Sequence, residues 1–276
     1  MTDVGIRSSI IKGSFNADSL SLFAEAGFHI IELSFNAPGV HLDYLNKVLG
    51  RSIQKRGEQL SMKILAHAPY KLSLTSPDQA VVNMAVEEYL HVLEGAVCFG
   101  ARRLVIHACV ERIDEMTQKR LRISNLLQAL RRIERCCAER RIELAVETMI
   151  PGRLTSDIDL LVNVIEQIDS PWVGICLDTN HVNLSHSVHE AIIKGGRQIN
   201  EIHANDNHGV EEEHLLPYFG VINWLAVVKA IDTIHFQGDI IMEPNHHKGK
   251  SDHEMLACSH AQAEKLLQEL KNRSAS

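Results

Sequence analysis

The stretch VGICLDTNH, residues 173–181, shows most directly how this chain folds. It opens with an apolar run, Val173 to Leu177, that contains a single glycine, and it then places Asp178 and His181 directly after that run. A short apolar run that ends at polar residues is typical of a strand buried on both faces of a parallel sheet. The segment therefore predicts a core strand with polar side chains at its carboxyl end.

The same pattern occurs seven more times, and longer stretches with helical periodicity, such as residues 76–99 and 117–140, separate the runs. Ser76 and Ser156 are the expected N-caps of two of these helices. The other expected strands are residues 4–10, 30–35, 63–70, 103–109, 142–148, 199–206 and 238–244. Eight βα units without a Gly/Ser-rich or Pro-rich linker predict an α/β protein with a single (β/α)8 TIM barrel, one domain over residues 1–276. A doubly wound sheet is the alternative, but IRSSIIKGSFN, residues 6–16, lacks its GxGxxG turn.

Composition narrows the function classes. The net charge of -7 gives no general attraction for nucleic acid or for an anionic membrane, so a nucleic-acid partner is unlikely. No apolar run is long enough for a membrane span or a signal peptide, and none of the six cysteines forms a CxxC pair. We therefore expect a cytoplasmic protein with reduced thiols, and a homo-oligomer remains possible.

Histidines and acids follow the expected strands one after another. They are His67, His107, Glu147, Asp178, His181, His203 and Glu243. Taken alone, each could be a hydrogen-bonded structural residue or a helix cap. A closed barrel brings all these strand ends around one axis, however, and a divalent metal ion is the simplest partner for mixed imidazole and carboxylate groups. The pattern therefore predicts a metal site at the carboxyl end of the barrel.

The ordered motifs AHAPY, VIHA, VET, CLDTNH, IHANDN with a following histidine, and MEP run through nearly the whole chain. This series resembles the xylose isomerase-like TIM-barrel superfamily, which includes sugar phosphate isomerases and epimerases, ketose 3-epimerases and endonuclease IV. The resemblance to the ketose 3-epimerases implies that Glu147, Asp178, His203 and Glu243 hold a divalent ion (Mn, Zn, Co or Mg). It also implies that Glu147 and Glu243 form the acid/base pair around a metal-stabilised enediolate.

The resemblance to endonuclease IV implies a larger ligand set and up to three metal ions per chain. It adds His67, His107, His181 and His214 as possible ligands of metal or substrate, and it places Glu212 where that family has an aspartate. This substitution leaves the number of metals, from one to three, open.

The favoured function is a metal-dependent isomerase or epimerase acting on a small sugar, sugar phosphate or polyol. An endonuclease IV-like zinc phosphodiesterase acting on abasic DNA and a keto-polyol lyase or dehydratase of the same superfamily are the alternatives. A groove that binds DNA needs many basic side chains. The basic residues in the expected loops are few and far apart: Lys71, Arg112, Arg153, Lys248 and Lys250. These residues could instead hold one phosphate or carboxylate group of a small substrate. The substrate-binding candidates are Glu32, Lys71, Arg153 and Lys248, and Glu32 could equally serve a structural ion pair.

Overall fold

Eight parallel strands close into a barrel in the computed structural model, which describes residues 3–35, 40–69, 72–112, 118–247 and 249–274. Around the barrel the order is β1-β10-β9-β8-β7-β6-β5-β3, so β1 closes the ring by pairing with both β10 and β3. The barrel strands are β1 Val4–Arg7, β3 Ile30–Ser34, β5 Lys63–His67, β6 Arg103–Ile106, β7 Glu143–Glu147, β8 Val173–Asp178, β9 Ile199–His203 and β10 Asp239–Met242. The predicted (β/α)8 barrel is confirmed.

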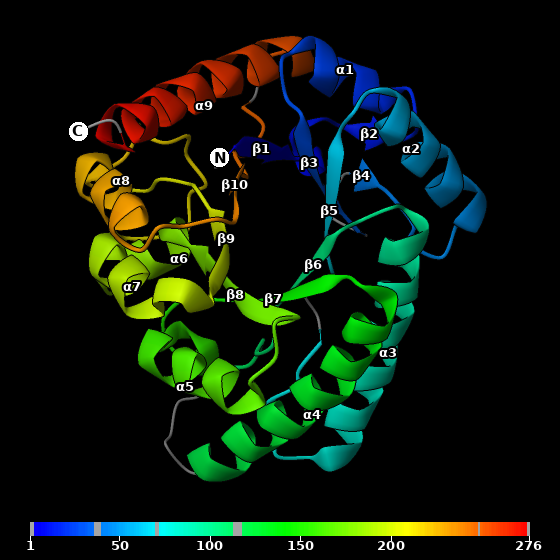
Figure 1. Cartoon of the computed structure of the whole chain (residues 1–276), viewed down its shortest axis with the longest axis vertical. Coiled ribbons are helices and arrows are strands. Elements are labelled where there is room, and N and C mark those ends of the chain that lie inside the picture. The colour runs from blue at the N-terminus through cyan, green and yellow to red at the C-terminus, as the bar shows by residue number, and fades with distance from the viewer. Residues whose placement is uncertain (1–2, 36–39, 70–71, 113–117, 248, 275–276) are drawn as a thin grey trace.

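Helices form a ring outside the strands, and the long α9 closes it between α8 and α1 (Figure 1). They are α1 Ser19–Glu25, α2 Lys47–Gln59, α3 Gln79–Cys98, α4 Lys119–Arg140, α5 Ile158–Ile168, α6 Thr179–Asn183, α7 Val188–Gly195, α8 Trp224–Thr233 and α9 Asp252–Ser274. Short strands β2 Gly13–Ser14 and β4 Val40–His41 pair with each other outside the barrel. Within the described residues, no helix combines the length and apolar character that crossing a membrane requires.

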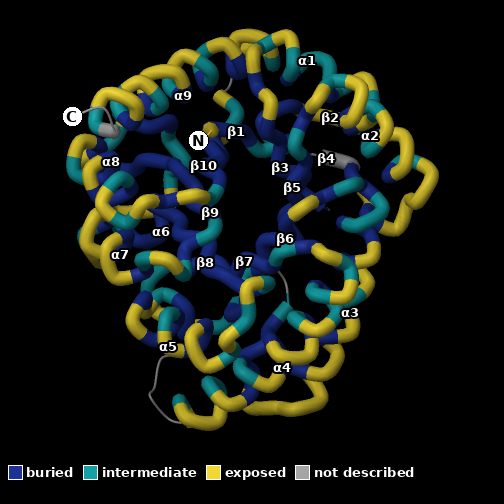
Figure 2. The backbone as a smooth tube through the Cα atoms, in the orientation of Figure 1, coloured by how far each residue is buried: buried dark blue, intermediate teal, exposed yellow. Residues whose placement is uncertain are grey.

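Burial explains why these segments adopt these structures. The barrel strands are buried along almost their whole length, whereas the helices expose their outer faces (Figure 2). In α5, Leu161, Val164 and Ile165 are buried, while the intervening polar positions reach solvent. This spacing of three and four residues is what a helix needs in order to cover a sheet with one face.

Two details of the expected elements are wrong. The caps of α3 and α5 are Asp78 and Asp157, whose carboxylates accept backbone N–H bonds, rather than Ser76 and Ser156. The strand expected over residues 173–181 ends at Asp178, because its carboxylate accepts the N–H groups of Asn180 and His181 and so starts helix α6 there.

A β-bulge in β9 determines which residue of this strand lies opposite Asp178 of β8. Ile199 pairs with Ile175, but Glu201 pairs with the next residue, Cys176, so Asn200 is an extra residue in β9. The pairing then continues regularly until His203 lies opposite Asp178. The bulge therefore brings an imidazole, and not the side chain of Ile202, level with that carboxylate.

Candidate metal centre

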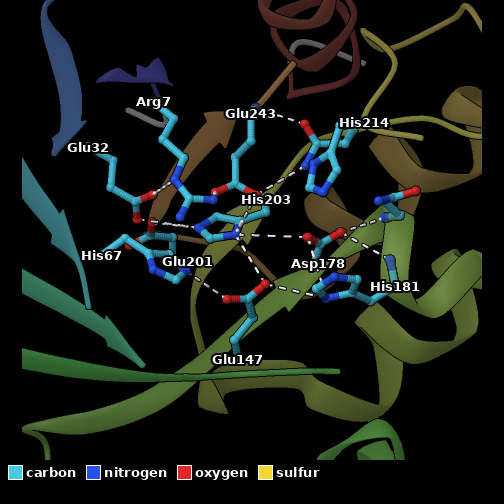
Figure 3. A network of polar contacts seen from close by, with 12 residues as sticks. Arg7, Glu32, His67, Glu147, Asp178, His181, Glu201, His203, His214 and Glu243 are labelled. Atoms are coloured by element: carbon cyan, nitrogen blue, oxygen red, sulfur yellow. Dashed lines mark hydrogen bonds and ion pairs between the residues drawn. The ribbon is translucent and has the colours of Figure 1, made fainter. Parts of the chain in front are cut away.

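Four side chains from neighbouring strands meet at the carboxyl end of the barrel. Glu147 ends β7, Asp178 ends β8, His203 ends β9 and Glu243 directly follows β10. One ligand atom from each lies within 4.8 Å of the others, and all four residues are buried (Figure 3). The structure therefore brings together the four residues that the family resemblance implied as ligands of the principal metal.

The donor atoms of this group fit a divalent cation. His203 Nδ1 lies 3.1 Å from Glu243 Oε2, 3.6 Å from Glu147 Oε1 and 4.0 Å from Asp178 Oδ2. Among the described residues, His203 Nδ1 and Asp178 Oδ2 are buried without a hydrogen-bond partner. Unpaired buried polar atoms are costly, and a cation between them would satisfy both. One imidazole nitrogen and three carboxylates form a donor set suited to zinc, manganese and related ions.

Two histidines hold Glu147 from the side of β5 and β6. His67 Nε2 and His107 Nε2 lie 2.9 and 2.7 Å from Glu147 Oε2. Burial raises the pKa of Glu147, but the charge of His107 and the close approach of the His107, His203 and His67 rings outweigh burial and hold the pKa well below 4.5. Glu147 is therefore ionised, and the predicted extra ligands His67 and His107 do surround it.

Arg7, the last residue of β1, holds Glu243 and was missed by the sequence prediction. Its guanidinium forms an ion pair with Glu243 and donates to Ser34 Oγ at 2.7 Å. Burial raises the pKa of Glu243, but the charges of Arg7 and His203 lower it well below 4.5. The signal was present in the sequence, since Arg7 ends a strand just as His67 and Glu147 do.

A second group of possible ligands lies nearer the cavity mouth. His181 Nε2 and His214 Nε2 lie 3.4 and 2.8 Å from Glu212 Oε1, and these three residues form a further cluster able to hold a metal. Burial lowers the pKa of His181, but Asp178, Glu212 and Glu147 together raise it to about 10. The replacement of aspartate by Glu212 therefore still leaves a compact cluster of three donors.

Two carboxylates lie behind His203, on the side away from the ligand group. His203 Nε2 is 3.2 Å from Glu201 Oε1 and 3.4 Å from Glu32 Oε2. Burial, reinforced by Glu201 and opposed by His203, raises the pKa of Glu32 to about 8. Glu32 is fully buried and is not among the residues lining the cavity, so its position fits the structural ion pair and not substrate contact.

A cavity of about 720 Å³ opens beside this group of four side chains. Glu147, Glu243 and Arg7 lie in its wall, together with the cationic side chains of Lys12 and Arg153. Within the described residues no ion pair involves Lys12 or Arg153, and Arg153 Nε is buried without a hydrogen-bond partner. The other two predicted substrate-binding cations, Lys71 and Lys248, lie outside the described residues.

A comparison of the sequence with models of known protein families agrees with this barrel fold. A family model described as xylose isomerase-like TIM barrel matches residues 20–272. The chain belongs to this xylose isomerase-like TIM barrel family.

The similar proteins include a ketose 3-epimerase and probable endonucleases 4. The chain is 27% identical over 118 residues to D-psicose 3-epimerase of Enterocloster bolteae, covering 42% of this chain and 38% of that protein. It is 30% identical over 165 residues to a probable endonuclease 4 of Mycoplasma mobile, covering 58% and 52%. The chain thus spans about half or less of the length of these curated relatives. A solved structure, of a D-tagatose 3-epimerase-like protein, superposes with a TM-score of 0.84 at 22% identity, covering 99% of this chain and 100% of that one.

Proposed function

We propose that the chain is a divalent-metal-dependent isomerase or epimerase acting on a sugar or a related polyol. The observation that supports this best is that the carboxylates of Glu147 and Glu243 both lie close to one atom, His203 Nδ1. Their carboxylates come from β7 and β10 and approach His203 Nδ1 at 3.6 and 3.1 Å. Both residues also line the cavity, so a substrate bound there can exchange a proton with either carboxylate.

The two carboxylates are suited to proton transfer at a carbon beside a carbonyl. A bound divalent ion, held by Glu147, Asp178, His203 and Glu243, would supply the positive charge that stabilises an enediolate. Both glutamates are held in the ionised form by their neighbours, and each can therefore accept a proton. One carboxylate removes the proton from the carbon, and the other, after taking up a proton from solvent, returns it from the opposite side, which inverts the carbon.

Arg153 is the proposed contact for an anionic group of the substrate. Its guanidinium lines the cavity, its Nε is buried without a partner, and no described carboxylate forms an ion pair with it. Arginine binds a phosphate or carboxylate with two parallel hydrogen bonds. We expect Arg153→Gln to raise KM for a phosphorylated ketose at least tenfold with little change in kcat, and to leave KM for the neutral ketose unchanged.

Metal-dependent phosphodiester hydrolysis is the second candidate. The cluster of His181, Glu212 and His214 favours it, because paired metal sites act on phosphodiesters by stabilising both the attacking and the leaving oxygen. His67, Glu147 and His203 form a further cluster able to hold a metal, and His107 lies 2.7 Å from the same glutamate. Against it stands the small number of lysines and arginines that line the cavity within the described part of the chain, namely Arg7, Lys12 and Arg153, since a DNA duplex requires many phosphate contacts.

Metal analysis combined with two activity assays tests these proposals. The purified protein is stripped with chelator, reloaded with Mn²⁺, Co²⁺ or Zn²⁺, and incubated with a panel of free and phosphorylated ketoses, with products followed by NMR. Metal-dependent exchange of a substrate proton with solvent deuterium, together with a new epimer or isomer, supports the first proposal. Cleavage of an abasic duplex by a protein carrying two or three zinc ions, with no ketose turnover, would replace the first proposal with the second.

A further inference from the structure

Glu201 occupies an unusual position for a carboxylate. It is the third residue of β9, two positions before His203, so both side chains point into the barrel. It is fully buried, and it is not among the residues that line the cavity above the ligands. The proposed proton transfer does not use it, and a buried charge at mid-strand needs an explanation.

The two carboxylate oxygens of Glu201 face opposite ends of the barrel. Oε1 accepts from His203 Nε2 at 3.2 Å, and Oε2 accepts from Arg103 Nη1 at 3.2 Å (Figure 3 shows the His203 side). Arg103 in turn donates to Glu143 at 2.8 Å and to Asp239 at 2.7 Å. Arg103, Glu143 and Asp239 are each the first residue of a barrel strand, so this ionic group lies at the end of the barrel away from the site.

Glu32 also approaches His203 Nε2, but its position is less well fixed. Its distance is 3.4 Å, and its other oxygen, Oε1, has no hydrogen-bond partner and meets only Arg7 Nε, at the longer distance of 3.6 Å. Glu201 is closer and is anchored on its far side by an arginine that two further carboxylates hold. Of the two, Glu201 is therefore the carboxylate that can fix the orientation of the imidazole.

We propose that Glu201 is a positioning residue for His203, holding the ring proton on Nε2 so that Nδ1 presents its lone pair to the group of Glu147, Asp178 and Glu243. A carboxylate on the far nitrogen of a metal-binding histidine fixes both the tautomer and the ring orientation. Glu201 and Arg103 then connect the site to the ionic group at the other end of the barrel. This proposal rests on the proposed metal-binding role of His203.

The chain offers a matched pair of variants. Glu201→Gln and Glu143→Gln each remove one carboxylate from Arg103, but only Glu201 touches His203. Each protein is stripped with chelator and titrated with Co²⁺. The ion at the principal site is recognised as the one whose binding is lost in the variant Asp178→Asn. We expect Glu201→Gln to weaken binding at that site by about tenfold to hundredfold. We expect Glu143→Gln to stay within twofold of the wild type. Equal affinities in the two variants would overturn the proposal.

Two measurements on the wild-type protein need no variant. Long-range ¹H–¹⁵N NMR of the histidine rings should show the His203 proton on Nε2, both without metal and with Zn²⁺. A proton on Nδ1 alone in the loaded protein would overturn the proposal.

Cys176, Glu201 and His203 also lie close enough to share a metal. A thiolate-to-Co²⁺ charge-transfer band would make Glu201 a ligand and would likewise overturn it. If the wild type binds no Co²⁺ at all, the proposed function fails, whereas the position of the ring proton still decides whether Glu201 orients His203.

Discussion

Arg7→Met tests how strongly the charge at the end of β1 stabilises the barrel. Arg7 forms ion pairs with Glu243 and, at 3.6 Å, with Glu32. The side chains of the two glutamates are 2% and 0% exposed, and that of Arg7 is 16% exposed. Methionine keeps much of the volume and removes the charge, which leaves the buried Glu243 carboxylate without its cation and takes away the charged neighbour of Glu32, whose pKa burial already raises.

The size of the effect follows from this burial. Removing one partner of a buried ion pair costs roughly 3–5 kcal/mol. We expect about 3 kcal/mol, the lower end of that range for a broken buried pair, because Arg7 is partly exposed and His203 Nδ1 remains 3.1 Å from Glu243. At about 2–4 °C per kcal/mol for chains approaching this length, Tm should fall by roughly 6–12 °C. A divalent metal should recover part of this loss, because it replaces the missing positive charge beside Glu243.

Thermal unfolding in EDTA and in excess Mn²⁺ checks both statements. The matched control is Arg132→Met, because Arg132 pairs at the surface with Glu87 and such exposed pairs contribute at most about 1 kcal/mol. Arg7→Met should unfold well below the control in EDTA, and Mn²⁺ should raise its Tm more than it raises the Tm of the wild type. A fall of less than about 2 °C in EDTA would refute the assigned role of Arg7, as would equal metal-induced rises in the variant and the wild type.

Glu147→Gln and Glu243→Gln should each lower kcat on the ketose substrate by about 10²–10⁴ while far-UV circular dichroism stays unchanged, because the amide keeps the shape but cannot accept the proton. Full activity in either variant would remove that residue from the acid/base pair. Gly238→Ala should lower the urea unfolding midpoint more than Gly174→Ala does. At Gly238 the added Cβ would lie 2.1 Å from the backbone oxygen of Asn200, whereas at Gly174 it would meet only the end of the Asn200 side chain, at 2.5 Å, which can rotate away. We expect about 1–3 kcal/mol for Gly238→Ala, and equal midpoints for the two variants would contradict this reasoning.

The strands and their polar ends could be predicted because both depend on local sequence. An apolar run must be buried, and a parallel barrel gathers the residues that follow each run. The same rule identified seven polar residues at strand ends, and the family resemblance selected four of them, Glu147, Asp178, His203 and Glu243, whose side chains the structure brings together. The predicted N-cap residues of α3 and α5 were wrong by one or two positions, because a serine and a nearby aspartate compete for the same backbone N–H groups.

The contacts of Arg7 and Glu201 could not be predicted from local sequence. Arg7 meets Glu243 only because β1 closes the barrel against β10, and 236 positions separate the two residues in the chain. Glu201 lies within an otherwise apolar strand, and its partner Arg103 starts a strand 98 positions away. Such pairings depend on which strands close the ring and on their register, neither of which an isolated strand pattern specifies.

The bulge at Asn200 makes the length of β9 as important as its composition. If Asn200 instead took part in regular pairing from Ile175 and Ile199, Ile202 would lie opposite Asp178, and His203 would lie one position beyond it. Since side chains alternate between the two faces of a strand, the imidazole would then turn toward the helices, away from the barrel axis. Asn200 also packs against Gly174 and Gly238, so two glycines on flanking segments leave the space for this extra residue. A deletion of Ile202 would likewise move His203 to the level of Leu177 and would be as damaging as the replacement of His203 itself, whereas a deletion of Asn200 would remove the bulge and keep His203 opposite Asp178.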